Sequence, residues 1–338
     1  MGNKMSTIEV RELKKSEYKM WDELVENSPQ GTVFHSSSWL NTCSEILNKK
    51  LKVYGCFKNG ELIGGCPLYI YKFGFLKTAS SVIKMTPYGG VVLAQLPNNK
   101  VREKERIYRN IIASLCETLD NQHFSNIQII NSPGFIDVRP FIWKNWDSKI
   151  HYTYHLILND FEKRISRDAK RNIKKAIKNE ISIEKSRDID LFYELFKETF
   201  SRQGLKPPVT KKFLANVFNM LLKYKKGEMW IAKTKSKEVA AAEIFVYDSK
   251  RAYRWSAATH TKLRKTGAYS LLLFEVFKDM QNRGFKEINL MAANMPQLAE
   301  FITSFNPKLL PYYEVQRASI FYTLYKQAHK VVKVIKKR

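Results

Sequence analysis

A single acidic residue, Glu243, lies inside the apolar segment Val239–Tyr247, which is typical of a buried strand. Burying a carboxylate costs free energy unless the carboxylate is paired with a cation, hydrated or part of a functional site. If burial raises its pKa toward neutrality, Glu243 can act as a general base that deprotonates an attacking ammonium group. An ion pair with Arg254 or Lys233 on a neighbouring strand is the alternative. Tyr253 and Arg254 are candidates for substrate contacts.

A basic segment, Lys163–Lys178, contains eight basic residues and one acidic residue, Asp168. Helical spacing places its apolar residues on one face and its cations on the other, so the helix can pack on a sheet while it presents cations to phosphate groups. A solvated basic face is the alternative. The candidates for substrate binding on this helix are Arg167, Arg171 and Lys174.

Two further positions combine a cation with a helix end. Arg202 and Gln203 precede Gly204 at the end of a predicted helix and can hold a carboxylate or a phosphate. The alternative is a C-terminal cap, in which Gly204 adopts a left-handed conformation and the charge of Arg202 interacts favourably with the helix dipole. The segment Arg264–Ala268 opens another predicted helix, where free backbone N–H groups favour an anion. We predict that Arg264, Thr266 and Gly267 bind phosphate groups there, and that bulky Tyr269 narrows their approach.

One pattern of elements occurs twice in the 338 residues. Val53–Ile70 reads as a strand, a polar turn and a strand that starts with small residues, and Trp230–Val246 repeats it, with Ala240-Ala241 where the first copy has Gly64-Gly65. A long helix, a strand, a short helix and a final strand follow each hairpin. A repeat at this distance indicates domain duplication, because solenoid repeats run at roughly 20 to 50 residues. Two α/β domains with a cleft between them suggest an enzyme.

The second half contains a regular series of helices and strands. We expect a helix over 161–179, a strand over 181–184, helices over 189–203 and 211–224, the hairpin, a strand over 251–257, a helix from 266 to 284, and closing elements to residue 315. This order resembles that of a GNAT acyltransferase domain. The expected fold class is therefore α/β (α+β): two tandem GNAT-like domains with mixed sheets flanked by helices. The expected domains are 1–158 and 159–318, the second with a basic first helix, followed by the basic amphipathic tail 319–338.

The net charge of +26 favours anionic partners such as nucleic acid, phosphate-bearing substrates or anionic membranes; a lysine-rich proteome or simple solubility is the plain alternative. Hydrophobic content of 44% argues against disorder. The tail Ile320–Arg338 has six basic residues and no acidic one, so we expect either weak peripheral membrane contact or a surface-docked helix.

The four cysteines have no CxxC spacing and the histidines form no ligand pair, so we expect buried free thiols and no metal site. No apolar run reaches the roughly 18 residues that span a bilayer, and the N-terminus lacks a signal-peptide core. We expect a cytoplasmic protein, either free or peripheral at the inner face of the membrane.

Four further segments carry a recognisable pattern: SPQGTVFHSSSWL (Ser28–Leu40), SRDAKRNIKKAIKNEISI (Ser166–Ile183), LFKETFSRQG (Leu195–Gly204) and FITSFNPKLLPYYEV (Phe301–Val315). With them, the chain resembles the FemABX family of duplicated GNAT-like proteins over nearly its whole length. The most family-like element is the pattern Arg171, Asn172, Lys175 and Ala176.

The resemblance implies transfer of an amino acid from charged tRNA to a lipid-linked cell-wall precursor, and related proteins are CelD or BioF2-like acyltransferases. It places a phosphorylated acceptor in the interdomain cleft near Arg167, Arg171 and Arg202, and the donor near Arg264–Tyr269. The chain departs from the family in lacking a coiled-coil arm that some tRNA-using members carry. It departs from the GNAT CoA-binding loop by placing Tyr269 where that loop has Gly or Ala.

The sequence therefore predicts an amide-forming acyl or aminoacyl transferase acting on an amine of a cell-envelope precursor, with no tightly bound cofactor. The co-substrate is either aminoacyl-tRNA or acyl-CoA; Arg264 and Gly267 favour acyl-CoA and Tyr269 opposes it. The rival from another class is a non-catalytic protein that binds nucleic acid or a membrane surface. The sequence leaves the oligomeric state open.

Overall fold

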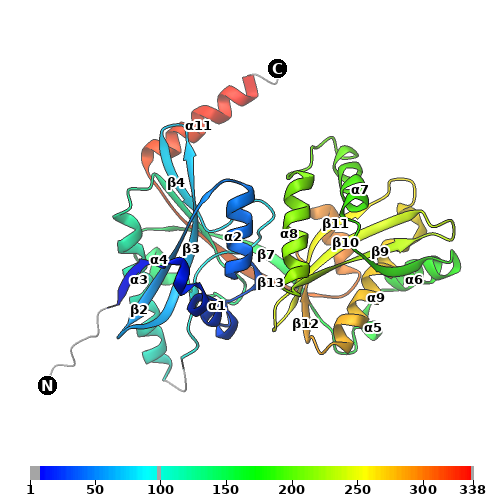
Figure 1. The fold of residues 1–338 in the computed structure, drawn as a ribbon, viewed down its shortest axis with the longest axis horizontal. Coiled ribbons are helices and arrows are strands. Elements are labelled where there is room, and N and C mark those ends of the chain that lie inside the picture. The colour runs from blue at the N-terminus through cyan, green and yellow to red at the C-terminus, as the bar shows by residue number, and fades with distance from the viewer. Residues whose placement is uncertain (1–7, 97–99, 336–338) are drawn as a thin grey trace. The chain divides into compact units, whose positions relative to one another are not determined.

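The computed structural model describes residues 8–96 and 100–335, and its chain divides into two compact units (Figure 1). Unit 1 consists of 1–151 and 312–338, and unit 2 of 152–311. The expected domains 1–158 and 159–318 divide the chain at one point. In the structure, the last strand of each expected domain instead joins the sheet of the other unit. His155–Ile157 pair with a strand of unit 2, and Glu314–Ala318 pair with a strand of unit 1. Sequence periodicity cannot reveal which sheet such a strand joins.

Unit 1 is a mixed sheet with helices packed on it. Its strand order is β1-β2-β3-β4-β6-β13, with β5 on β3, and β4 runs parallel to β6. The strands are β1 (Glu9–Glu12), β2 (Lys50–Lys58), β3 (Glu61–Phe73), β4 (Leu76–Ser80), β5 (Val92–Leu93), β6 (Asn126–Ile130) and β13 (Lys308–Ala318). The helices are η1 (Lys15–Glu17), α1 (Tyr18–Asn27), η2 (Val33–His35), α2 (Ser37–Ile46), α3 (Val101–Asp120), α4 (Arg139–Ile142) and α11 (Ile320–Ile335).

The predicted hairpin of unit 1 consists of β2 and β3, and the long helix, strand and short helix predicted after it are α3, β6 and α4. The Ser36 side chain accepts a hydrogen bond from Trp39 N and caps α2. The strand β4 is an addition that the sequence analysis did not expect. All four cysteines are buried and free, which confirms that prediction, and burial raises the pKa of the Cys56 thiol to about 12.

Unit 2 is a second mixed sheet, in the order β7-β12-β11-β10-β9-β8. Helices α6 and α9 pack on one face, and α7 and α8 contact β11, β10 and β9. The strands are β7 (Asp147–Ile157), β8 (Ser182–Ser186), β9 (Gly227–Lys233), β10 (Val239–Tyr247), β11 (Ala252–Thr259) and β12 (Glu287–Asn289). The helices are α5 (Phe161–Arg164), α6 (Arg167–Lys178), α7 (Ile189–Ser201), α8 (Lys211–Lys223), η3 (Arg264–Thr266), α9 (Ala268–Asn282) and α10 (Pro296–Thr303).

The single helix expected over 161–179 is two helices in the structure. Ile165 is extended, and Ser166 then caps α6 by accepting a hydrogen bond from Ala169 N at 3.1 Å. The favourable N-cap competes with helix continuation because the serine side chain replaces a missing backbone partner. The predicted apolar face of α6 is confirmed, since Ala169, Ile173 and Ala176 are buried.

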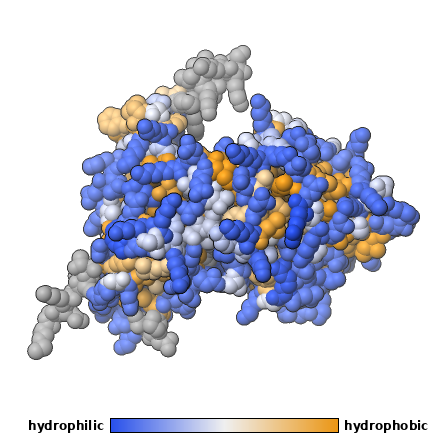
Figure 2. Space-filling model, viewed as in Figure 1, coloured by the Kyte–Doolittle hydropathy of each residue, from blue (hydrophilic) through white to orange (hydrophobic). Residues whose placement is uncertain are grey.

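Hydrophilic residues cover much of the face seen in Figure 2, in keeping with the charge of the chain. Within the described residues, no helix is long and apolar enough to cross a membrane. The same residues hold no group of His, Cys, Asp and Glu that could bind a metal ion.

Candidate active site

The parallel strands β11 and β12 of unit 2 separate soon after they meet. They pair only at Ala252 with Ile288 and at Tyr253 with Asn289, after which β12 ends while β11 continues to Thr259. We call the region where β11 continues past Tyr253 the strand opening. Such a separation exposes backbone groups and side chains in the middle of a sheet, where a ligand can approach them.

A charged network lies at the strand opening. Arg254 Nε donates to Glu243 Oε1 at 2.7 Å, and the Tyr269 hydroxyl donates to Glu243 Oε2 at 2.7 Å. Arg254 Nη2 donates to the same hydroxyl, while Nη1 reaches Leu290 O at 3.4 Å across the opening. The network therefore links β10, β11, α9 and the residue that follows β12.

Glu243 is buried, with 1% of its side chain exposed, and the Arg254 side chain is 10% exposed. Burial raises the pKa of Glu243 above its usual range, although Arg254 and the Tyr269 hydroxyl oppose this change. Burial also raises the pKa of Tyr269 well above that of a free tyrosine. Because both carboxylate oxygens hold donors, the geometry favours the ion pair with Arg254 that the sequence offered as the alternative. The other offered partner, Lys233, pairs with Glu184 instead. The role of Glu243 as a general base stays a prediction.

Tyr269 points into unit 2. Its hydroxyl contacts Glu243, and its ring stacks on Phe301 with centroids 5.4 Å apart. The sequence treated this side chain as an obstacle in a phosphate-binding loop, whereas the structure makes it part of the buried network. The signal that could have revealed this is the pairing of a buried acid on one strand with an arginine on the next, because such a pair needs a further polar partner.

Two cations from different elements lie near each other: Arg202 at the end of α7 and Arg264 in the loop between β11 and α9. Arg202, at the end of α7, donates to Thr261 Oγ1 at 3.1 Å and to Thr259 O at 3.4 Å. Partial burial and the nearby charge of Arg264 both lower the pKa of Arg202. Arg202 thus links the end of α7 to the end of β11 and the loop after it, and does more than interact with the dipole of its own helix. An anion bound between Arg202 and Arg264 would reduce the repulsion between their two guanidinium groups.

Gly267 has a packing role in this loop. Its φ of +86° is one that other residues rarely adopt, and a Cβ there would lie 2.2 Å from Asn172 O of α6. Thr266 Oγ1 donates to Leu263 O at 2.7 Å, and Thr266 O accepts from Asn179 Nδ2 at 3.3 Å. The loop predicted to bind phosphate therefore packs directly against the basic helix.

The cations of α6 face solvent. Arg167, Arg171 and Lys174 are exposed, and Arg171 Nη2 pairs with Asp168 Oδ1 at 2.9 Å, with both side chains more than 70% exposed. This is the face that an anionic ligand could reach, and it is also what a solvated basic face looks like. The structure brings α6 and the Arg264–Gly267 loop together, and their phosphate-binding roles stay predictions.

Two other predicted substrate contacts have local partners. Tyr253 is 1% exposed and its hydroxyl donates to Asp248 Oδ2 at 3.0 Å, which places it in the core and away from an open surface. Gln203 Nε2 donates to Thr199 O at 3.1 Å on its own helix. Gly204, with φ of +68°, ends that helix as the cap alternative predicted.

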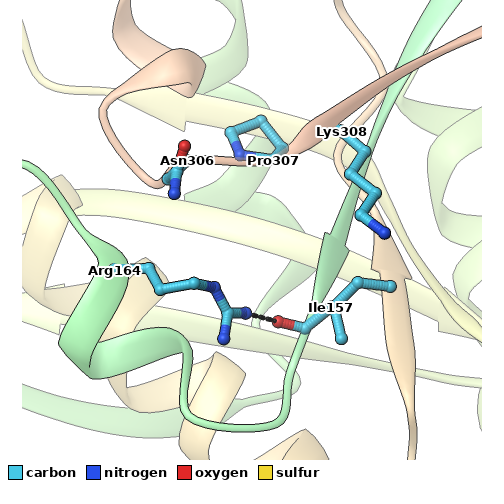
Figure 3. A pocket seen from close by; sticks show the side chains of 5 residues that line it. All are labelled: Ile157, Arg164, Asn306, Pro307 and Lys308. Carbon is cyan, nitrogen blue, oxygen red and sulfur yellow. Dashed lines mark hydrogen bonds between the residues drawn. The ribbon is translucent and has the colours of Figure 1, made fainter.

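A pocket of about 450 Å³ lies elsewhere in unit 2. Figure 3 shows Arg164 on one side, where Nη2 donates to Ile157 O at 2.5 Å, with Lys308 also lining the pocket. Asn306 and Pro307 complete the lining. The sequence analysis did not single out this pocket, because its residues come from distant segments.

A histidine and an acid that the sequence analysis also missed meet in unit 1. His151 Nε2 and Glu314 Oε2 lie 2.8 Å apart, and Gln128 Nε2 donates to Glu314 Oε1 at 2.7 Å. The imidazole stacks on Tyr312 with centroids 5.2 Å apart. These residues are separated by more than 150 positions in the sequence, so no local motif could have indicated the pair.

Comparison with known proteins supports the fold. Residues 162–297 match the family model described as "Acetyltransferase (GNAT) domain". A crystal structure of FemX is similar with a TM-score of 0.68 and 12% identity, covering 90% of this chain and 96% of that one. The chain has a FemABX-like fold with a GNAT domain. No curated protein sequence matches it.

Two further structures share this FemABX-like fold. L-PGS from Bacillus licheniformis has a TM-score of 0.58 and 13% identity, with 96% of this chain and 97% of that one covered. A tandem GNAT protein from the clavulanic acid biosynthesis pathway has a TM-score of 0.54 and 11% identity, with 92% and 98% covered. The prediction of two tandem GNAT-like domains is confirmed. The domain match and the fold together support a general acyltransferase activity.

Proposed function

We propose that this FemABX-like protein forms an amide by transferring an acyl or aminoacyl group to an amine of a phosphate-bearing cell-envelope precursor. The observation that carries the proposal is the strand opening, where Arg254 is held by Glu243 and Tyr269, with Arg264 in the loop before α9 and Arg202 at the end of α7 near each other. In the fold of acyltransferases, this arrangement can position an activated carbonyl and bring an amine to it. Positioning of this kind can supply a large part of the rate.

Each group has a role in this proposal. Arg254 presents a fixed positive charge to the donor carbonyl, and Glu243 and Tyr269 hold the guanidinium in place. Arg264 contacts the donor phosphates, while Arg167, Arg171 and Lys174 contact the acceptor phosphates. The sequence placed Arg202 with the acceptor; because Arg202 lies near Arg264 in the structure, the proposal assigns it to the donor phosphates instead. The carboxylate of Glu243 takes the amine proton only if a ligand displaces one of its donors.

Two observations support an aminoacyl-tRNA donor over acyl-CoA. Arg254 reaches Leu290 O across the strand opening, where an extended acyl-CoA arm would have to enter. Gly267 lies against Asn172 O, so the loop glycine serves helix packing and is not left open to a pyrophosphate. The name FemX belongs to a structural neighbour and supports the same choice by analogy alone.

The donor can be tested by calorimetric titration at physiological salt with acetyl-CoA, charged tRNA and uncharged tRNA. We expect tighter binding of charged than of uncharged tRNA and no binding of acetyl-CoA. Micromolar binding of acetyl-CoA would favour the acyl-CoA alternative. Equal binding of both tRNAs, falling steeply with salt, would favour a non-catalytic nucleic-acid-binding protein, which the net charge of +26 also supports.

The phosphate contacts can be tested by charge removal. In Arg202→Ala and Arg171→Ala, turnover should fall by about tenfold or more, since a charge-assisted hydrogen bond contributes about 1.5–3 kcal/mol. Arg187→Ala is the matched control, because Arg187 is exposed in the same unit and has no proposed contact. Unchanged acceptor affinity and turnover in Arg171→Ala would exclude α6 as the phosphate clamp. An equal loss in Arg187→Ala would mean that overall charge matters and not the site.

A further inference from the structure

Exposed apolar residues gather on unit 1 where the turn between β3 and β4 meets α11. On the turn, Phe75 is 83% exposed. On the first turns of α11, Ile320 is 70%, Phe321 71% and Leu324 57% exposed. Figure 2 shows hydrophobic residues at this end of unit 1, where Figure 1 places α11 beside β4. We call these four residues the apolar patch.

Ring contacts hold the turn and the helix together beneath the apolar patch. The Tyr325 ring lies 5.0 Å from that of Phe73 and 5.9 Å from that of Phe75, and the Tyr322 ring lies 6.0 Å from that of Phe73. Gly74, with φ of +62°, allows this approach, because a Cβ there would lie 2.7 Å from the Tyr325 hydroxyl. The patch is therefore a surface built from two distant segments.

The charge around the patch is entirely positive in both segments. Residues 62–80 contain Lys72 and Lys77 and no acidic residue, and the tail from Ile320 contains six basic residues and no acidic one. Lys72 is exposed, and Lys326 Nζ lies 5.8 Å from the centroid of the Tyr322 ring. Apolar side chains that point outward among lysines are typical of segments that lie in a membrane interface.

We propose that the apolar patch docks unit 1 on the surface of an anionic lipid bilayer, with the β3–β4 turn and α11 inserting together. A second copy of the chain fits this surface less well, because each copy carries a net charge of +26 and the two would repel. Nucleic acid also fits less well, because the exposed aliphatic side chains of Ile320 and Leu324 add nothing to base stacking, whereas a lipid interface accepts them together with Phe75 and Phe321. This inference is independent of the proposed transfer reaction.

The test is co-sedimentation of the full chain with vesicles of phosphatidylcholine alone and with added phosphatidylglycerol, at physiological salt and without substrate. We expect binding to the anionic vesicles and a loss of at least about tenfold in the Phe75→Ser/Phe321→Ser double variant. Ile136→Ser is the matched control, since Ile136 is 72% exposed in unit 1 outside the patch. Its binding should equal that of the unaltered chain.

Three outcomes would overturn the proposal. They are no binding to anionic vesicles, equal binding of the double variant, and a double variant that turns a dimer into a monomer, which would make a second copy the occupant. A thermal unfolding curve of the double variant that matches the unaltered chain shows that the fold is retained. Transfer activity with water-soluble substrates should be unchanged in the double variant, so failure here leaves the proposed function untouched.

Discussion

The two units differ in the contacts made beyond the point where their parallel strands stop pairing. In unit 1, β4 pairs with β6 over three residues, and the loop that follows continues along β6 through its backbone: Ser81 N donates to Gln128 O at 2.9 Å and Gly89 N to Ile130 O at 3.1 Å. In unit 2, the pairing of β11 with β12 ends after two residues, and side chains take over. We call these backbone hydrogen bonds between the loop and β6 the backbone seal of unit 1. They keep one arrangement, whereas the charged side chains at the strand opening of unit 2 can change their contacts when a ligand binds. The comparison favours unit 2 as the place of chemistry.

The hairpins show a related difference at matching positions. Gly65 of unit 1 has no room for a side chain, since a Cβ would lie 2.4 Å from Tyr54 O, while Ala241 of unit 2 is accommodated in the core. Three residues after Gly64 stands Pro67, and three residues after Ala240 stands Glu243. One copy of the repeat thus keeps an apolar strand where the other holds a buried charge.

The largest expected effect comes from breaking the charged network of unit 2. Arg254→Leu leaves Glu243 buried without its ion-pair partner, which should destabilise β10 and β11 by about 3–5 kcal/mol. Amide hydrogen exchange of these strands measures the change. The double variant Glu243→Leu/Arg254→Leu should be destabilised less than the single variant, because no unpaired charge remains. An equal or larger loss in the double variant would show that packing, and not charge pairing, determines the effect.

An intermediate effect is expected from breaking the backbone seal of unit 1. In Gly90→Ala the new Cβ would lie 2.3 Å from Asn131 Oδ1, so unit 1 should lose about 1–3 kcal/mol through overpacking. Exchange protection of β6 should fall while that of β11 stays constant. Gly60→Ala is the control, because a Cβ there meets nothing within 4 Å and only the turn strain remains. Equal effects of the two variants on β6 would contradict the seal.

The smallest expected effect is on the pH dependence of stability, and it comes from two carboxylates, each paired with an arginine, whose pKa values change in opposite directions. In unit 1, hydrogen bonds from Arg11 lower the pKa of half-buried Glu17 to about 2, whereas burial raises that of Glu243 in unit 2. The stabilisation by Glu17 is present above its unfolded pKa and is lost as the pH falls toward about 2. The contribution of Glu243 is present at low pH and is lost as the pH rises through its folded pKa.

An NMR titration that follows the side-chain carboxyl carbons measures the pKa values of Glu17 and Glu243 and so tests which of the two is lower. We expect the midpoint of Glu17 to lie below that of Glu243, and Glu17 should move toward an ordinary value in Arg11→Gln. A midpoint of Glu243 at or below that of Glu17 would contradict the dominance of burial over the charge of Arg254. Salt should shift the pKa of Glu17 more than that of Glu243, because the Arg11–Glu17 pair is the more exposed of the two and solvent ions screen it better.

Much of the fold follows from local signals. The hairpins, the α6 stripe and the left-handed Gly204 were all predicted, because each depends on residues within a few positions of one another. The strand β4 was missed, since five residues after an aromatic turn carry little periodicity. For the site, the sequence offered the pairing of Glu243 with Arg254 that the structure shows, whereas the phosphate-binding role of the Arg264–Gly267 loop stays a prediction.

The sequence by itself determined the duplicated pattern, the positive charge and the residue types available for chemistry, because these depend on composition and short spacing. Only the tertiary structure decided that Tyr269 points to Glu243, that Arg202 bridges to Thr259 and Thr261, and that Phe75 meets α11. The physical reason is the same in each case. These contacts join segments from different elements, and the direction of a side chain is set by the packing of its whole unit.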